Sequence, residues 1–150
     1  MSKTAPQIRY LNTDLCLVSA ENLTPLTDEL TARGVRPLGD VPSESSGCWY
    51  ANLEIGECLD TPENTICVML DALEAIGADA KQLWAACSKR EFNIGYDCGD
   101  EPWAFNNELC SATVKRIASL NASIVITIYP YRAEPTEKPP KRKQTKRKKP

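Results

Sequence analysis

Apolar and polar residues alternate along several short stretches of the chain, and this pattern predicts β-strands. In residues 8–20, one side of an extended chain carries Leu15 and Leu17 and the other side carries Asn12, Asp14 and Cys16. The same alternation predicts further strands at residues 35–38, 48–55, 90–98 and 123–131. One apolar side for each strand indicates a sheet with one face covered and the other open.

Between these strands, apolar residues one helical turn apart predict helices. Two Thr-Pro pairs mark helix starts, because a threonine hydroxyl can accept a free backbone N–H and proline at the first helical position loses no needed donor. The expected caps are Thr24, Thr61, Asp79 and Ser111. Gly34 and Gly77 are expected to end the first two helices. The side chains expected to face inward are Leu26, Leu30, Ile66, Leu70, Leu73, Ile76, Val114, Ile117 and Leu120.

The resulting order is β-α-β-β-α-α-β-α-β, with residues 39–47 expected to form a loop because of their serines and glycines. This order predicts an α+β fold, a ferredoxin-like split β-α-β sandwich with an added helix and strand. Its helices would lie on one face of a mainly antiparallel sheet. The 150 residues suit a single α+β domain at 8–133, between a disordered lead at 1–7 and a disordered tail at 134–150.

The formal net charge of −2 averages over two unlike parts of the chain. Residues 1–133 contain 10 basic and 18 acidic side chains, whereas residues 134–150 contain 8 basic and 2 acidic ones. A segment of this composition cannot bury enough apolar surface to offset the entropy of ordering. Its cations predict non-specific, salt-sensitive contact with nucleic acid, without base stacking because no aromatic residue is interleaved. The tail residues concerned are Lys141, Arg142, Lys143, Lys146, Arg147, Lys148 and Lys149.

The chain contains seven cysteines and no histidine. The cysteines never occur as C-x-x-C, so the paired ligands of a thiolate zinc site are missing. We therefore expect no metal and no cofactor, and we expect the cysteines to act as small buried or half-buried hydrophobic residues. No run of about 18 apolar residues predicts a membrane span, and the first residues lack the apolar core of a signal peptide. These features predict a cytoplasmic protein with no membrane contact.

Residues 90–105 combine carboxylates with aromatic side chains more densely than any other stretch. A strand with alternating apolar residues ends in a turn of composition Cys-Gly-Asp-Glu-Pro, and Trp103 follows. Such a group of acidic residues could bind a hard cation or supply a general acid and base, but the spacing matches no known loop for either purpose. A third interpretation is a recognition surface for a basic partner, with Tyr96, Asp97, Asp100, Glu101 and Trp103 as contact residues. The alternative is structural: the indole plugs the edge of the core and the carboxylates face water.

Polar residues of two predicted strands form a second, weaker candidate site. If the first strand and the strand at 90–98 are neighbours, then Asn12, Asp14 and Asn93 lie on one open face of the sheet. An open face can bind a ligand or partner, but it is also what an antiparallel sheet commonly presents to solvent.

Four segments of the sequence resemble a bacterial α+β family catalogued as domain of unknown function 4279. They are Leu11–Leu15, Glu91–Asp97, Trp103 and Ala122–Tyr129. The resemblance covers about residues 8–132 and implies a bacterial cytoplasmic α+β domain. That family has no established activity, so the resemblance supplies no catalytic residue. Some of its members lie near toxin and immunity genes, which implies at most a binding role.

These observations favour a non-enzymatic protein-binding domain, immunity-like in character, with an acidic aromatic contact surface and a basic partner. One alternative is a nucleic-acid-associated protein that acts through its basic tail. A second alternative is a small carboxylate-dependent enzyme. The chain lacks histidine, a nucleophile elbow and a phosphate-binding glycine loop, which makes an enzyme less favoured without excluding it.

Overall fold

The computed structural model describes residues 5–39, 43–57 and 59–131. Within this part of the chain it contains four helices and six strands. The strands are β1 (Arg9–Ser19), β2 (Val35–Pro37), β3 (Ser43–Ser45), β4 (Cys48–Ile55), β5 (Lys89–Asp97) and β6 (Ser123–Tyr129). The helices are α1 (Thr24–Thr31), α2 (Pro62–Glu74), α3 (Ala78–Ala86) and α4 (Ser111–Ser119). The predicted tail at 134–150 lies outside the described residues.

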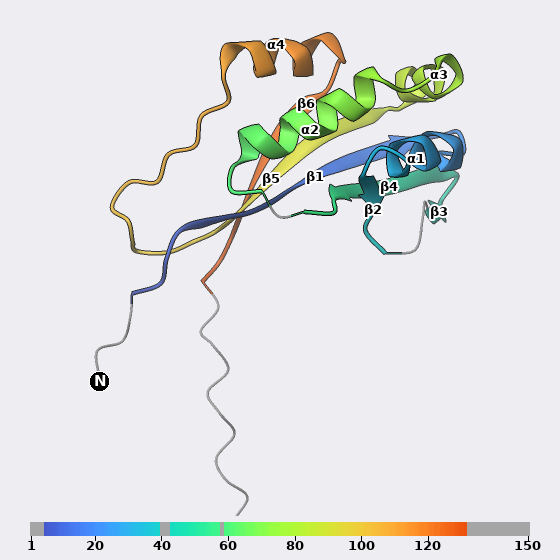
Figure 1. Cartoon of the computed structure of the whole chain (residues 1–150). Coiled ribbons are helices and arrows are strands. Elements are labelled where there is room, and N and C mark those ends of the chain that lie inside the picture. The colour runs from blue at the N-terminus through green and yellow to red at the C-terminus, as the bar shows by residue number, and fades with distance from the viewer. Residues whose placement is uncertain (1–4, 40–42, 58, 132–150) are drawn as a thin grey trace, which may run out of the picture.

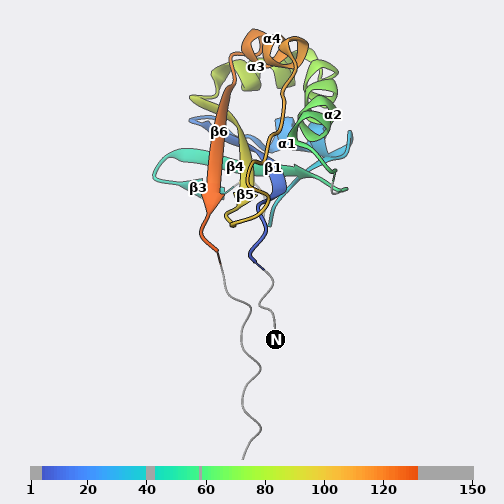
Figure 2. The ribbon, with the colours of Figure 1, turned by 90° about the vertical axis from the view of Figure 1, so that its left-hand side faces the viewer.

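The strands form one mainly antiparallel sheet in the order β2-β4-β1-β5-β6, with β3 paired to β4. The two strands joined through α1 are separated by β4, and the two joined through α2 and α3 are separated by β1. This is the split β-α-β arrangement, so the predicted α+β fold class is confirmed. Strand β6 is the added strand: α4 leads back to it, and it pairs parallel to β5. The four helices lie on one side of the sheet (Figures 1 and 2).

The sheet register aligns the apolar side chains of neighbouring strands. Leu15 of β1 lies between Leu53 of β4 and Phe92 of β5, and all three are fully buried beneath the helices. A β-bulge between Tyr10 and Asn12 shifts the alternation at the start of β1. The bulge keeps the Tyr10 ring on the helix side, where its hydroxyl meets Thr65 of α2 at 3.0 Å.

The helices complete the core mostly with the residues that helical spacing predicts. The predicted residues that are buried are Leu26, Leu30, Ile66, Leu70, Leu73, Ile76 and Ile117. Met69, Ala80 and Trp84 are buried as well. Helix α2 begins as expected, since the Thr61 side chain accepts a hydrogen bond from the Asn64 backbone N–H. Trp84 is buried with its indole N–H satisfied, because it donates to the Leu120 carbonyl at 3.0 Å.

Three of the four predicted caps are wrong. The N-cap of α1 is Leu23, and the Thr24 N–H is instead accepted by the Asn22 side chain at 2.8 Å. The N-cap of α3 is Gly77 rather than Asp79, and the N-cap of α4 is Cys110 rather than Ser111. Gly77 therefore begins a helix, while Gly34 ends α1 at φ +86° as expected.

Other local predictions also need correction. The predicted loop at 39–47 contains β3, which forms a hairpin with β4. Val114 is exposed, and the buried residues of α4 are Ile117 and Thr113. Among the six described cysteines, all free, Cys98 and Cys110 are exposed rather than buried or half-buried. None of the helices in the described ranges is long and apolar enough to cross a membrane.

Candidate functional site

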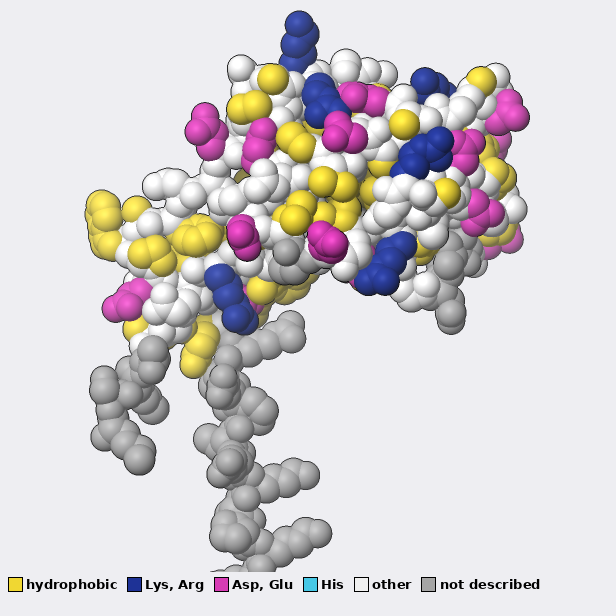
Figure 3. Space-filling model, viewed as in Figure 1, with side chains coloured by type: hydrophobic (Ala, Val, Ile, Leu, Met, Phe, Trp, Pro, Cys, Tyr) yellow, Lys and Arg dark blue, Asp and Glu magenta, His cyan; other side chains and the backbone are white. Residues whose placement is uncertain are grey.

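The densest group of exposed aromatic and acidic side chains lies on the loop that joins β5 to α4. Residues 101–108 of this loop are all exposed, and Trp103 is 99% exposed. Hydrophobic side chains gather over this region, at the left of Figure 3. The structural alternative, in which the indole plugs the edge of the core, is therefore wrong. Exposed apolar side chains that gather in one patch are a common mark of an interaction surface.

Backbone contacts with the N-terminal segment hold the acidic turn in place. The Pro6 carbonyl accepts from the N–H groups of Asp100, at 2.8 Å, and Glu101, at 3.2 Å. The Ile8 N–H donates to the Glu101 carbonyl at 2.6 Å. Pro6 and Gln7, which the sequence places in a disordered lead, thus form hydrogen bonds with the turn. The turn is a defined surface and not a loose loop.

Gly99 makes this close approach possible. A Cβ atom at this position would lie 2.5 Å from the Ile8 backbone nitrogen and 2.6 Å from the Pro6 oxygen. Both distances are shorter than real Cβ contacts allow, and the atoms in the way are backbone atoms that cannot rotate aside. The requirement for glycine here is therefore steric.

A chain of aromatic rings joins the exposed loop to the sheet. The Tyr96 ring makes edge-to-face contacts with Tyr10 and with Phe105, each with ring centroids 5.9 Å apart. The Asn107 side chain donates to the Tyr96 hydroxyl at 3.3 Å. Tyr96 is consequently half-buried and supports the loop instead of projecting from it.

An apolar groove lies between this loop and β6. Its volume is about 420 Å³, and its walls include Tyr96, Phe105, Ile126 and Ile128. The two isoleucines are 63% and 66% exposed, because no helix of the described chain covers the end of β6. The sequence did not predict that these two isoleucines line a surface groove. Their alternation along the strand favours burial, and they are exposed because of the position of α4.

Asp97 follows Tyr96 on β5 and lines both the apolar groove and a larger cavity beside it. Its carboxylate accepts from the Arg9 Nε–H at 2.6 Å and faces a cavity of about 640 Å³ that also includes Asn12 and Tyr129. Neither Asp100 nor Glu101 lines this cavity. In the described residues, no group of three or more acidic or cysteine side chains is arranged to hold a metal ion.

Of the five predicted contact residues, Asp100, Glu101 and Trp103 therefore share one exposed loop. Tyr96 lines the adjoining groove and Asp97 is paired beside it. No family model, no curated protein and no solved structure matches the chain. The resemblance to domain of unknown function 4279 thus stays a prediction, and the function must be inferred from the site itself.

The open face of the sheet brings together the second set of predicted residues. Asp14 and Asn93 are register partners on β1 and β5, and the Asn12 side chain donates to Asp14 at 2.8 Å. The Asn93 side chain accepts from the Thr127 hydroxyl at 2.7 Å. Burial raises the pKa of the Asp14 carboxyl, and the negative charge of Glu54 raises it further, while the bond from Asn12 opposes both.

Replacing Asp14 with asparagine is expected to stabilise the fold slightly at pH 7. The folded-state pKa of Asp14 lies above its unfolded value, so stability falls as the pH rises through that interval and stays lower above it. Asparagine removes the charge and keeps an acceptor for Asn12. We expect a gain of about 0.5 kcal/mol after allowance for solvent screening, and no gain below the unfolded pKa. Urea unfolding at several pH values measures this.

The exposed Glu21 supplies the control for this pH series, because Glu21→Gln removes one negative charge from a solvated position. Its stability should differ little from that of the unchanged protein. An equal gain in both variants would show that net charge, and not the surroundings of Asp14, causes the effect.

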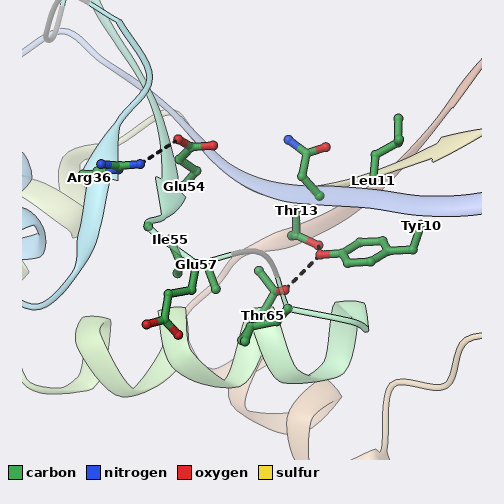
Figure 4. Close-up of a pocket in the computed structure, with 11 residues that line it drawn as sticks. Tyr10, Leu11, Thr13, Arg36, Glu54, Ile55, Glu57 and Thr65 are labelled. Carbon is green, nitrogen blue, oxygen red and sulfur yellow. Dashed lines mark hydrogen bonds and ion pairs between the residues drawn. The ribbon is translucent and has the colours of Figure 1, made fainter.

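A third, smaller cavity lies where the β1 bulge meets the end of β4 and the start of α2 (Figure 4). Its volume is about 280 Å³. Arg36 and Glu54 form an ion pair of 3.7 Å on one side, and the Tyr10 hydroxyl bonds to Thr13 and Thr65 on the other. Most of the polar groups that line this cavity are thus paired with one another, which leaves it a weaker candidate than the loop.

Proposed function

We propose that the chain is a non-enzymatic protein-binding domain of the bacterial cytoplasm, and that the loop carrying Asp100, Glu101 and Trp103 contacts a basic partner. An immunity-like role, in which the partner is a cationic toxin, is one form of this proposal. The bacterial and cytoplasmic setting comes from sequence reasoning alone. The contact surface comes from the geometry of the loop.

The observation that carries the proposal is the complete exposure of Trp103. Tryptophan is the residue type most enriched at the centres of protein interfaces, because its ring buries a large apolar area and its N–H finds a partner. Here the loop around the indole is held by backbone bonds to Pro6 and Ile8 and by the edge-to-face contact of Phe105 with Tyr96. The surface is therefore preorganised, and binding a partner would lose little conformational entropy in ordering it.

The charge around the indole favours a basic partner. Asp100 and Glu101 are exposed, and neither forms an ion pair with another described residue. Residues 1–133 as a whole carry an excess of eight negative charges. A negative electrostatic potential raises the association rate of basic proteins and disfavours the binding of acidic ones, most strongly at low salt.

Replacing Trp103 with alanine is expected to weaken partner binding at least tenfold. Truncating a tryptophan at the centre of an interface typically costs about 2 kcal/mol or more of binding free energy. The double variant Asp100→Asn and Glu101→Gln should slow association and reduce the salt dependence. Partners captured by the tagged chain from its host are identified by mass spectrometry, and the binding of each purified partner is then measured by calorimetry.

Tyr50→Ala supplies the matched control, because Tyr50 is an exposed aromatic residue on β4, far along the sheet from the loop. Partners that depend on the proposed surface are lost with Trp103→Ala and kept with Tyr50→Ala. Capture that is the same in all variants would remove the loop from consideration.

The two alternatives stay predictions of the sequence. The nucleic-acid hypothesis depends on residues 134–150, which lie outside the described residues. The carboxylate-enzyme hypothesis needs two of Asp14, Asp97, Asp100 and Glu101 in one cavity. Two cavities are lined by Asp97, and neither includes any of the other three.

A further inference from the structure

The two edges of the sheet are built differently. The β2 edge is three residues long and contains Arg36 and Pro37, which are features that discourage pairing with another strand. Strand β6, at the other edge, is seven residues long and contains no charged residue and no proline. Its pairing with β5 runs without a bulge. Long, uncharged edges are the ones that accept a further strand.

The outward backbone groups of β6 belong to its isoleucines. The Tyr129 carbonyl accepts from the Cys98 N–H at 2.9 Å, so the backbone of Tyr129 points toward β5. Because backbone direction alternates along a strand, the N–H and C=O groups of Ile124, Ile126 and Ile128 point away from the sheet. Their side chains are 38%, 63% and 66% exposed. The same three residues thus present both unpaired backbone groups and apolar surface.

We propose that β6 pairs with β6 of a second copy of this chain, antiparallel, with the two-fold axis passing through Ile126. This joins the two sheets into one and makes an isologous dimer. The proposal concerns the outer edge of β6 and does not rest on partner binding by the loop, although Ile126 and Ile128 also line the groove beside that loop.

The pattern of β6 selects this register. With Ile126 opposite Ile126, each Ile124 lies opposite an Ile128, and all outward N–H and C=O groups of the three residues pair. Six isoleucine side chains then form one continuous stripe on the helix side of the joined sheet. A shift of one residue would place backbone groups that point out of one strand opposite groups of the other strand that point back toward its own β5, so they could not pair. A shift of two would leave an isoleucine without an isoleucine opposite it.

A second copy suits this edge better than an unrelated strand. The edge is complementary to itself in hydrogen bonding and in side-chain shape, and no charge on β6 repels its counterpart. The interface is small, below about 1,200 Å², so the expected dimer is reversible with a micromolar Kd.

Sedimentation equilibrium of the purified full-length chain tests the proposal, and no other protein is needed. The expected mass at high concentration is twice the 16.6 kDa of one chain. Ile126→Lys places two ammonium groups on the two-fold axis, and Ile126→Pro removes an outward N–H that β5 does not use. Each change should raise the dimer Kd at least tenfold. Circular dichroism shows whether each variant folds. If Ile126→Pro does not fold, the dimer Kd of Ile126→Lys alone tests the proposal.

Val68→Lys is the matched control, because Val68 is a 40% exposed valine on α2, away from the sheet edge. It should leave the dimer unchanged. A protein that stays monomeric up to about 0.5 mM, far above a micromolar Kd, would overturn the proposal. Retention of the dimer by a folded Ile126 variant, or its loss in Val68→Lys, would also overturn it.

Discussion

Replacing Phe92 with alanine is expected to lower the free energy of unfolding by about 3–5 kcal/mol. Phe92 is fully buried at the centre of the sheet, between Leu15 on β1 and Ile124 on β6. Alanine removes the ring and leaves a cavity that neighbouring strands cannot close, because their hydrogen bonds fix their spacing. Urea unfolding followed by circular dichroism measures the loss.

Phe105 is the only other phenylalanine and provides a control of the same residue type. Its ring is 38% exposed and contacts Tyr96 edge to face, so Phe105→Ala should lower the free energy of unfolding by only about 1 kcal/mol. Equal losses in the two variants would mean that Phe92 is not the centre of the core.

Gly99→Val is expected to release the acidic turn from the N-terminal segment and to lower the free energy of unfolding by about 2–3 kcal/mol. The added Cβ would lie 2.5 Å from the Ile8 nitrogen, so the two backbones must separate. Their separation breaks the bonds that link Pro6 and Ile8 to the turn. Hydrogen exchange of the Ile8 and Asp100 amides should speed up strongly, while the core amides change less.

Gly56→Val supplies the comparison for Gly99, because a Cβ at Gly56 meets only the flexible end of Arg36, at 3.8 Å. That variant should remain close to the unchanged protein in both measurements. If Gly99→Val and Gly56→Val behave alike, the close approach at Gly99 is not what holds the turn.

Side-chain periodicity was a good guide to the fold because it is a local property that burial then enforces. The strand at 48–55 was predicted with its observed bounds, and Leu15, Leu17 and Leu53 are buried as their alternation requires. The fold class followed from the order of the elements, because a split β-α-β arrangement is one of few ways to cover one face of such a sheet.

Helix caps were predicted less well, since a capping residue and its neighbour look alike in sequence. Thr61 caps α2 as expected, but the other Thr-Pro pair begins one residue inside α1, where Leu23 takes the cap position. Leu23 is fully buried, so packing of its side chain, and not the Thr24 hydroxyl, decides where that helix begins.

The candidate site was predicted in its composition but not in its geometry. Tyr96 and Asp97 line the groove beside the loop, whereas Asp100, Glu101 and Trp103 lie on the exposed loop itself. The support for the loop comes from Pro6, Gly99 and Phe105, and the groove beside it from Ile126 and Ile128. The contacts of Pro6 and Ile8 with the turn join segments about 90 residues apart in the chain, and no local pattern signals them.

The sequence by itself determined the α+β class, most of the buried residues and the acidic character of residues 1–133, because each depends on residue type and spacing. Only the tertiary structure decided that Trp103 is exposed, that Gly99 must lack a side chain and that the isoleucines of β6 lie uncovered. Each of these depends on which distant segment lies against the residue. The exposure of these residues depends on which segments pack beside them, and local sequence patterns do not specify those segments.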